Sequence, residues 1–293
     1  MGMAVTRFKF ESPNIDNEKI WNSVAPRSKL IYEFGSSPRL VGGTTFNKHA
    51  AVDHNQVKLL ADAAIQSMDE TRQILTKWRR QGLSLGDIYI HRIAEAARLI
   101  GILWATDELD FVNCSIAYSR LHRTLLELSS EFMAEGDGEN KGLSVLLMTE
   151  PGSHHGLGIF MLSEFFRQAG WRVTLVTPHD IVDFKRVFLS DWFDAVVLSI
   201  STDRQIDTIS TALPDLHQAT VNPNLKIYVG GPLAQISPDL MNWNRTRLLN
   251  TNAGQTVQLI SQEVYEHLPE FVETSHSTSS INKNVKDVYK INI

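Results

Sequence analysis

Two adjacent histidines stand in a glycine-rich loop of the sequence. The segment Glu150-Pro151-Gly152-Ser153-His154-His155-Gly156-Leu157-Gly158 joins a short apolar run to a stretch with helical periodicity. A neutral imidazole is a good ligand for a transition metal. Gly158 follows His155 by three residues, and a glycine there lets a bulky group approach the backbone. The loop predicts a ligand site, although a polar surface loop without a ligand is the plainer alternative.

Small residues follow two further apolar runs. One run ends in Ser199-Ile200-Ser201-Thr202 and the next in Gly230-Gly231-Pro232. In a parallel sheet these ends meet at the same edge as the histidine loop, where α/β domains bind their ligands. The small side chains predict a deep slot between sheet and helices that could take a phosphate, a flavin or another nucleotide.

The elements that must position these residues are short strands alternating with helices. Four apolar runs rich in β-branched residues, and a weaker fifth, recur between segments of helical length, which is typical of a parallel sheet covered on both faces. The runs are 145–148, 173–176, 195–200, 225–229 and 247–249. We therefore expect an α/β fold with a five-stranded, flavodoxin-like (Rossmann-like) sheet.

The residues before this sheet have a different period. Apolar residues between 56 and 134 recur at spacings near three, four and seven, as in amphipathic helices. We expect one helix up to Gly82, a second from a Ser84 cap past Ile100, and a third over about 111–133, packed as a bundle.

Five segments follow from these patterns. We expect a lead-in of unknown role at 1–55, the helical bundle at 56–134, a polar glycine-rich linker at 135–142, the α/β domain at 143–272 and a polar, disordered tail at 273–293.

Composition limits the kind of protein. The chain has 293 residues, 43% of them hydrophobic, and a formal net charge of −5, which argues against bulk electrostatic binding of nucleic acid or anionic membrane. Its one cysteine, Cys114, has no internal partner for a disulfide. Because no run reaches the roughly 20 apolar residues of a spanning helix, and the first residues lack a signal-peptide core, we expect a cytoplasmic protein with no membrane contact.

The site motifs resemble the cobalamin-binding domain. That family has Asp-x-His-x-x-Gly before the first helix of a flavodoxin-like fold, Ser-x-Leu after the third strand and Gly-Gly after the fourth. On this chain His155 takes the histidine position and Gly158 the glycine, whereas His154 is excluded as ligand because Leu157 stands at its glycine position. Ser153 replaces the family Asp, so Glu150 would have to supply the supporting carboxylate.

The resemblance implies a set of cofactor-binding residues. His155 would ligate cobalt in place of the cofactor's own benzimidazole, and the freed nucleotide tail would enter the slot. The cofactor-binding residues implied in this way are Ser153, His154, His155, Gly158, Ser199, Ser201, Gly230 and Gly231. Ser201 departs from the family Leu.

The helical block resembles the cap that covers the other corrin face in cobalamin-binding transcriptional regulators. Its segments 85–104, 110–112 and 120–121 are most similar, in our judgement, to the PpaA/AerR group of photosynthesis regulators. Trp104 is then expected over the upper cobalt face, with a core tryptophan of the bundle as the alternative. The stretch Asn113-Cys114-Ser115, where light-sensing relatives carry Glu-His, leaves that face open and favours aquo- or hydroxocobalamin over adenosylcobalamin.

The function implied is a light- or redox-responsive transcriptional co-regulator, similar to an antirepressor, that acts through a partner repressor. Residues 1–50 show no convincing helix-turn-helix and the net charge is negative, so DNA contact is expected to be indirect or weak. No catalytic residue is predicted. Two alternatives use the same site: a corrinoid carrier in a methyltransferase system, and a haem-binding sensor.

Overall fold

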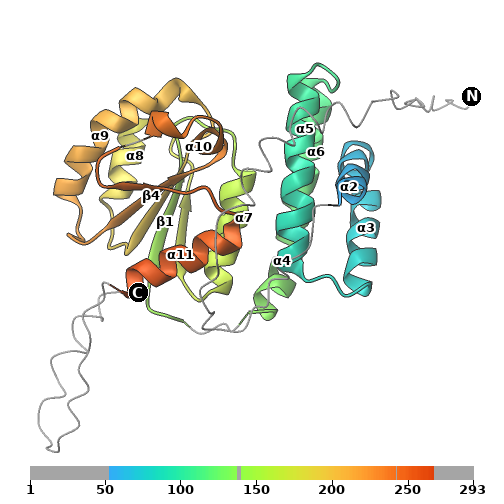
Figure 1. Ribbon diagram of the computed structural model, residues 1–293, viewed down its shortest axis with the longest axis horizontal. Coiled ribbons are helices and arrows are strands. Elements are labelled where there is room, and N and C mark those ends of the chain that lie inside the picture. The colour runs from blue at the N-terminus through green and yellow to red at the C-terminus, as the bar shows by residue number, and fades with distance from the viewer. Residues whose placement is uncertain (1–52, 137–139, 242, 267–293) are drawn as a thin grey trace, which may run out of the picture.

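The computed structural model describes residues 53–136, 140–241 and 243–266. Most of the predicted lead-in at 1–55, the whole of the predicted tail at 273–293 and the centre of the 135–142 linker lie outside these ranges. Within them, a bundle of helices stands beside an α/β part (Figure 1).

The α/β part is built on a five-stranded parallel sheet in the order β2-β1-β3-β4-β5. Its strands are β1 (Ser144–Thr149), β2 (Arg172–Val176), β3 (Ala195–Ser199), β4 (Lys226–Gly230) and β5 (Thr246–Leu248). This is the flavodoxin-like strand order. The predicted fold class is therefore confirmed, and each predicted apolar run overlaps a strand.

Helices cover both faces of the sheet (Figure 1). One face carries α7 (Leu157–Gln168) and α11 (Ala253–Tyr265), and the other carries α8 (Ile181–Phe188) and α9 (Ile206–Ala219). Short helical turns complete the connections: η2 (Asp203–Gln205), α10 (Pro232–Ile236) and η3 (Pro238–Met241).

The helical part contains a break that the sequence analysis missed. The single helix expected up to Gly82 is wrong, because α2 (His54–Gln66) and α3 (Met68–Arg80) are separate. Ser67 between them is extended, with φ −155° and ψ 139°, and its hydroxyl accepts the backbone N–H groups of Asp69 and Glu70. Ser67 thus caps α3, although the apolar stripe continues past it.

The second and third predicted helices are present. Ser84 caps the second, since its hydroxyl accepts the backbone N–H of Asp87. The helical path then runs through α4 (Leu85–Ile88), a π-helical turn η1 (Tyr89–Ile93) and α5 (Ala94–Ala105). The third is α6 (Phe111–Ala134).

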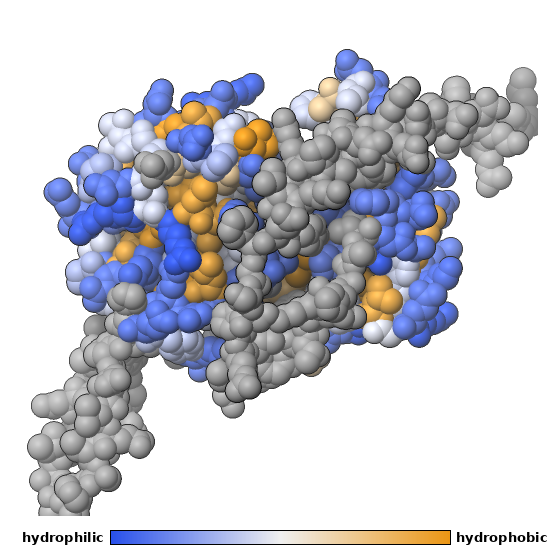
Figure 2. Space-filling view, in the orientation of Figure 1, coloured by the Kyte–Doolittle hydropathy of each residue, from blue (hydrophilic) through white to orange (hydrophobic). Residues whose placement is uncertain are grey.

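One apolar core runs through both parts. Tyr89 and Phe132 of the helical part stack with ring centroids 4.6 Å apart, and Phe132 meets Phe165 of α7 at 4.9 Å. Gln168 of α7 also donates from Nε2 to the Phe132 carbonyl oxygen at 2.6 Å. The outer side of α2 and α3 is mostly hydrophilic (Figure 2), and none of the described helices is both long and apolar enough to cross a membrane.

Candidate functional site

The histidine loop connects β1 to α7 at the carboxyl edge of the sheet. Gly152 has φ +73°, a backbone conformation that favours glycine, and its N–H donates to the Pro178 carbonyl oxygen at 2.9 Å. Gly156 is the N-cap of α7. The loop is thus held to the neighbouring β2–α8 connection at one end and leads directly into a helix at the other.

Both histidines of the loop are exposed. The Ser153 hydroxyl accepts the backbone N–H of His155 at 3.2 Å, so it holds the backbone and not the imidazole. Among the described residues no hydrogen bond or ion pair engages the His155 ring. Its nitrogen atoms therefore remain available to a ligand.

Glu150 does not act as the expected partner of His155. Its side chain is only 2% exposed, and its Oε2 accepts the backbone N–H of Ser201 at 3.1 Å. Its own N–H donates to the Ser199 carbonyl oxygen, also at 3.1 Å. Within the described residues no hydrogen bond joins Glu150 to either histidine. The carboxylate instead ties the histidine loop to the end of β3.

Three residues at the ends of adjacent strands form a row. Thr149, Ser199 and Gly230 are in register across β1, β3 and β4. Residues two positions earlier in these strands, Leu147, Val197 and Tyr228, belong to the core under α7 and α11, and strand alternation places the row on that same face. The sequence analysis missed Thr149, although a hydroxyl residue ending an apolar strand was a usable signal.

Two glycines, Gly230 at the end of β4 and Gly231 directly after it, lie close to neighbouring residues. A Cβ on Gly231 would lie 2.6 Å from the Ile200 carbonyl oxygen and 2.9 Å from the Ser199 Oγ, and one on Gly230 would lie 3.3 Å from the Leu249 Cβ. The expectation that these glycines leave an open slot is therefore wrong in this structure, because neighbouring strands occupy the space. Gly158 differs, since a Cβ added there would have no neighbour within 4 Å.

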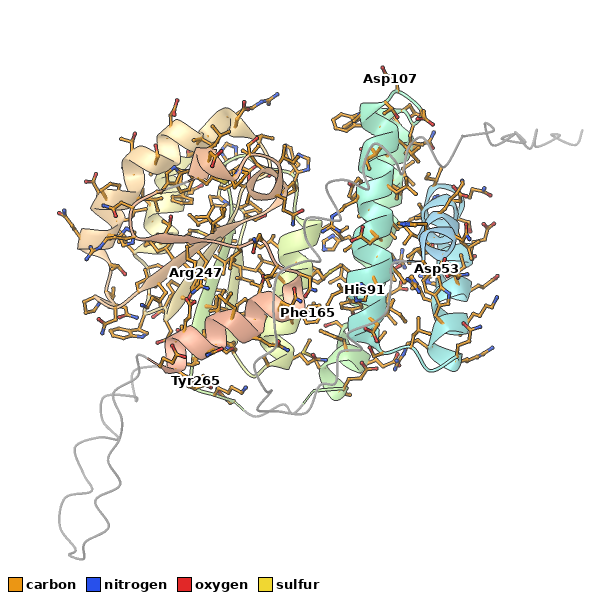
Figure 3. All side chains as sticks on the ribbon, viewed as in Figure 1. Asp53, His91, Asp107, Phe165, Arg247 and Tyr265 are labelled. Carbon is orange, nitrogen blue, oxygen red and sulfur yellow. The ribbon has the colours of Figure 1, made fainter. Side chains whose placement is uncertain are left out.

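Trp104 lies on α5 with 47% of its surface exposed, which excludes the alternative of a core tryptophan. Asp107, just beyond α5, marks the end of the helical part that lies level with the carboxyl edge of the sheet (Figure 3). Phe111, at 69% exposure, and Val112 are also exposed at this end. Cys114 is buried, and burial raises its pKa, so it is a core residue and not a thiolate ligand.

The described residues fit a cofactor that carries its own metal. None of them form a group of three or more metal-ligating side chains, so any metal would need ligands from elsewhere in addition to His155. Two buried hydroxyl oxygens at this edge, Thr149 Oγ1 at the end of β1 and Ser201 Oγ just beyond β3, have no hydrogen-bond partner among the described residues. These features suit a tetrapyrrole cofactor that carries a polar extension. The free imidazole could bind its metal, the open space at Gly158 leaves room for it, and the unpaired buried hydroxyls could bind the extension.

These features define a two-part protein, a flavodoxin-like domain preceded by a helical cap. Residues 143–248 match the model of the B12 binding domain family. This match covers the α/β part and agrees with the predicted resemblance to the cobalamin-binding domain.

Two known proteins are similar over much of the chain. One is the "Uncharacterized 20.5 kDa protein in bchF-crtJ intergenic region" of Rhodobacter capsulatus, 27% identical over 160 residues, which cover 55% of this chain and 83% of that protein. The other is the monomethylamine corrinoid protein of Methanosarcina barkeri, at 12% identity and a TM-score of 0.59, covering 72% of this chain and 99% of that one. The second similarity supports the fold.

Proposed function

We propose that this protein is a cobalamin-binding transcriptional co-regulator that responds to light or redox state and acts through a partner repressor. The observation that carries the proposal is that the His155 loop leads directly into α7, the helix that packs against the helical part. The Rhodobacter relative is named after its place between bchF and crtJ. This position supports a role connected with those neighbouring genes.

The roles of the residues follow from their positions. His155 would hold cobalt, and Ser153 would keep the backbone of His155 in place. Trp104 would cover the opposite face. Bound cobalamin, in its aquo- or hydroxo- form, would supply a metal centre whose ligation can change with light or redox state. The residues proposed to surround the tail are Gly158, Ser199 and Ser201.

Contacts of α7 give this site a route to the helical part. Phe160, in the first half of α7, meets the His122 ring of α6 edge-on with centroids 4.7 Å apart. Phe165 and Gln168 then contact Phe132 near the end of α6. A displacement of the histidine loop would therefore be passed to α6, and so to the surface offered to a repressor.

The charges described fit indirect contact with DNA. The last turn of α3 carries Lys77, Arg79 and Arg80, but Arg79 Nη2 lies 2.5 Å from Glu131 and 2.7 Å from Glu135. A paired arginine has little attraction left for phosphate. The basic end of α3 is therefore a weak candidate for operator binding.

The adjacent histidines allow a matched test. Apo-protein would be titrated with hydroxocobalamin for the wild type, H155A and H154A, following the cobalt absorption bands. We expect H155A to lose more than about tenfold in affinity and to change the bound spectrum, since losing even a supporting partner of a metal ligand costs that much. H154A should resemble the wild type, and equal behaviour of the two variants would exclude His155 as ligand.

A second experiment tests the regulatory part of the proposal. A candidate repressor from the host would be titrated with the cobalamin-loaded chain in light and in darkness, with H155A as control. We expect its affinity to differ between light and dark for the wild type and not for H155A. Equal affinities for the wild type under both light and redox change would contradict the regulatory role.

A corrinoid carrier remains the second candidate, because the monomethylamine corrinoid protein shares the fold. Loading the chain with methylcobalamin and supplying thiol or amine acceptors separates the two functions. Demethylation would favour the carrier. A haem-binding sensor is the third candidate, and the absorption spectrum of protein from its own host distinguishes haem from corrinoid.

A further inference from the structure

Two large aliphatic side chains are exposed in the connection between β4 and β5. Ile236, at the end of α10, is 61% exposed, and Leu240 of η3 is 48% exposed. Figure 2 shows hydrophobic side chains gathered on this side of the α/β part, with hydrophilic ones around them. Single exposed leucines are common on protein surfaces, whereas an apolar patch bordered by polar residues is typical of an interaction site.

A hollow opens beside these side chains. It has a volume of about 180 Å³ and is lined by Pro238, Asp239, Met241, Thr246 and Leu248. Leu240 therefore stands between two residues of the lining. An apolar cavity of roughly 150 Å³ can hold one benzene molecule, so the hollow is large enough for one aliphatic side chain. We call the two exposed side chains and the hollow together the β5 patch.

The β5 patch belongs to the face of the sheet that the helical part does not cover. Ala234 and Met241 are members of the core cluster under α8 and α9, and Leu248 packs against that cluster. The helical part joins the other cluster, which lies under α7 and α11. In the described sheet β5 is an edge strand that pairs with β4 alone. The patch is therefore separate from both the histidine loop and the contact with the helical part.

The patch carries two side chains of opposite charge. Asp239 lines the hollow, and Arg245 directly precedes Thr246, which also lines it. Both are exposed, and among the described residues no ion pair or hydrogen bond engages either side chain. The nearby Arg247 differs, because it pairs with Glu263. An acidic or a basic partner would match one of the two charges, whereas a second copy of the chain matches both.

We propose that the β5 patch joins two copies of this chain in a symmetric dimer. In a twofold interface each contact occurs twice, with the roles of the two copies exchanged. Leu240 of each copy would enter the hollow of the other, and Asp239 of each would pair with Arg245 of the other. The patch supplies both halves of each contact, which is the property that a twofold interface requires. The proposal does not depend on the cofactor.

The test follows the association of full-length apo-protein by sedimentation velocity. Concentrations from about 1 to 200 µM cover the range in which a small interface associates. L240D places a carboxylate in the interface, and L126D is its matched control, because Leu126 of α6 is 54% exposed and lies outside the patch. Thermal unfolding of each variant checks that it is folded.

Charge reversal tests the pairing of the two copies. D239R and R245D each replace two attractive contacts of the dimer by two repulsive ones, and the double variant exchanges the charges and restores both contacts. Aspartate also suits the backbone at position 245, where φ is +61°. Each single variant should weaken the dimer about tenfold, and the double variant should recover most of that loss.

We expect the wild type and L126D to show the same reversible equilibrium between monomer and dimer, with a dissociation constant in the micromolar range. L240D should remain monomeric at all concentrations used, because it would bury an unpaired charge.

Four outcomes would overturn the proposal. A wild type that stays monomeric throughout would leave the patch to another protein. Unchanged dimerisation of L240D would place the interface elsewhere, and equal losses in L240D and L126D would show a general effect of the new charge. Growth beyond the dimer would contradict twofold closure. The titrations of H155A and H154A test the proposed function separately.

Discussion

The two faces of the sheet differ in what they are joined to. On the α7 and α11 side, the apolar core continues through Phe165 and Phe132 into the helical part. On the α8 and α9 side, Phe184 and Phe188 belong to a separate cluster that contains only residues of the α/β part. The histidine loop leads into the first face. A structural change at His155 can therefore reach the helical part through side chains in direct contact. The second face has no such contact and serves as scaffold.

Truncating an aromatic residue on each face gives the largest expected effect. F165A and F184A should each lower the free energy of unfolding by about 3–5 kcal/mol, because both remove a buried ring. Only F165A should also raise hydrogen exchange in α6, since Phe165 contacts Phe132. Urea unfolding and hydrogen exchange resolved along the chain would measure both effects. Equal exchange in α6 for the two variants would break the comparison.

Substituting the glycines of the site should have the next largest effect on stability. G231A should destabilise the apo-protein by about 2–4 kcal/mol, because φ is +98° and the new Cβ would lie 2.6 Å from the Ile200 carbonyl oxygen. G158A should be neutral or stabilise by up to about 1 kcal/mol, since it fills open space in the first turn of α7. Thermal and urea unfolding would measure this difference, and a loss in G158A as large as that in G231A would contradict it.

Variants of Glu150 test the hydrogen bond that joins the histidine loop to the end of β3. E150A should cost about 1–3 kcal/mol, because the partly buried N–H of Ser201 loses its acceptor. E150Q retains a carbonyl oxygen and should recover most of the loss. Urea unfolding of the two variants would show whether a hydrogen bond or the charge matters. If E150Q is no more stable than E150A, the charge and not the acceptor is what stabilises the loop.

The smallest effect is a pH dependence at the contact between α6 and α7. Burial lowers the pKa of His122 below its ordinary value of 6.5. The unfolded chain therefore binds this proton first as the pH falls. Stability from neutral His122 is complete above pH 6.5 and is lost progressively below it, until the lower pKa of the folded state is reached.

Urea midpoints measured between pH 8 and pH 5, in steps of about half a unit, would test this dependence. H122L should flatten the decline below about pH 6.5 without removing it, because burial also lowers the pKa of His91. H91L is therefore the matched control. An unchanged decline in H122L would show that His122 is not protected from protonation at this contact.

The strands were predictable because each is an apolar run bounded by polar turns, and parallel pairing fixes where their ends meet. The break at Ser67 was not predictable, because a serine cap interrupts the helix without interrupting its apolar stripe. The π-helical turn at Tyr89 leaves no mark on the periodicity either. Both depend on tertiary packing, which a single sequence does not encode locally.

The site was predictable in its location more than in its contacts. The histidine loop lies at the expected edge of the sheet, and Trp104 is exposed as a cap residue should be. The bond from Glu150 to Ser201 was not foreseen, because it joins residues 51 positions apart. Gly230 and Gly231 looked like empty space in sequence, whereas in the structure they let neighbouring strands approach.

The short connection between Ala134 and Ser144 makes the contact of the helical part with α7 an intramolecular association. A tether of this kind holds its two ends at an effective concentration in the millimolar range. Any separation of the two parts would therefore be governed by an equilibrium that does not depend on how much protein a cell contains. A competitor for the inner side of α6 would have to overcome that local concentration, and its apparent affinity would rise in proportion as docking is weakened.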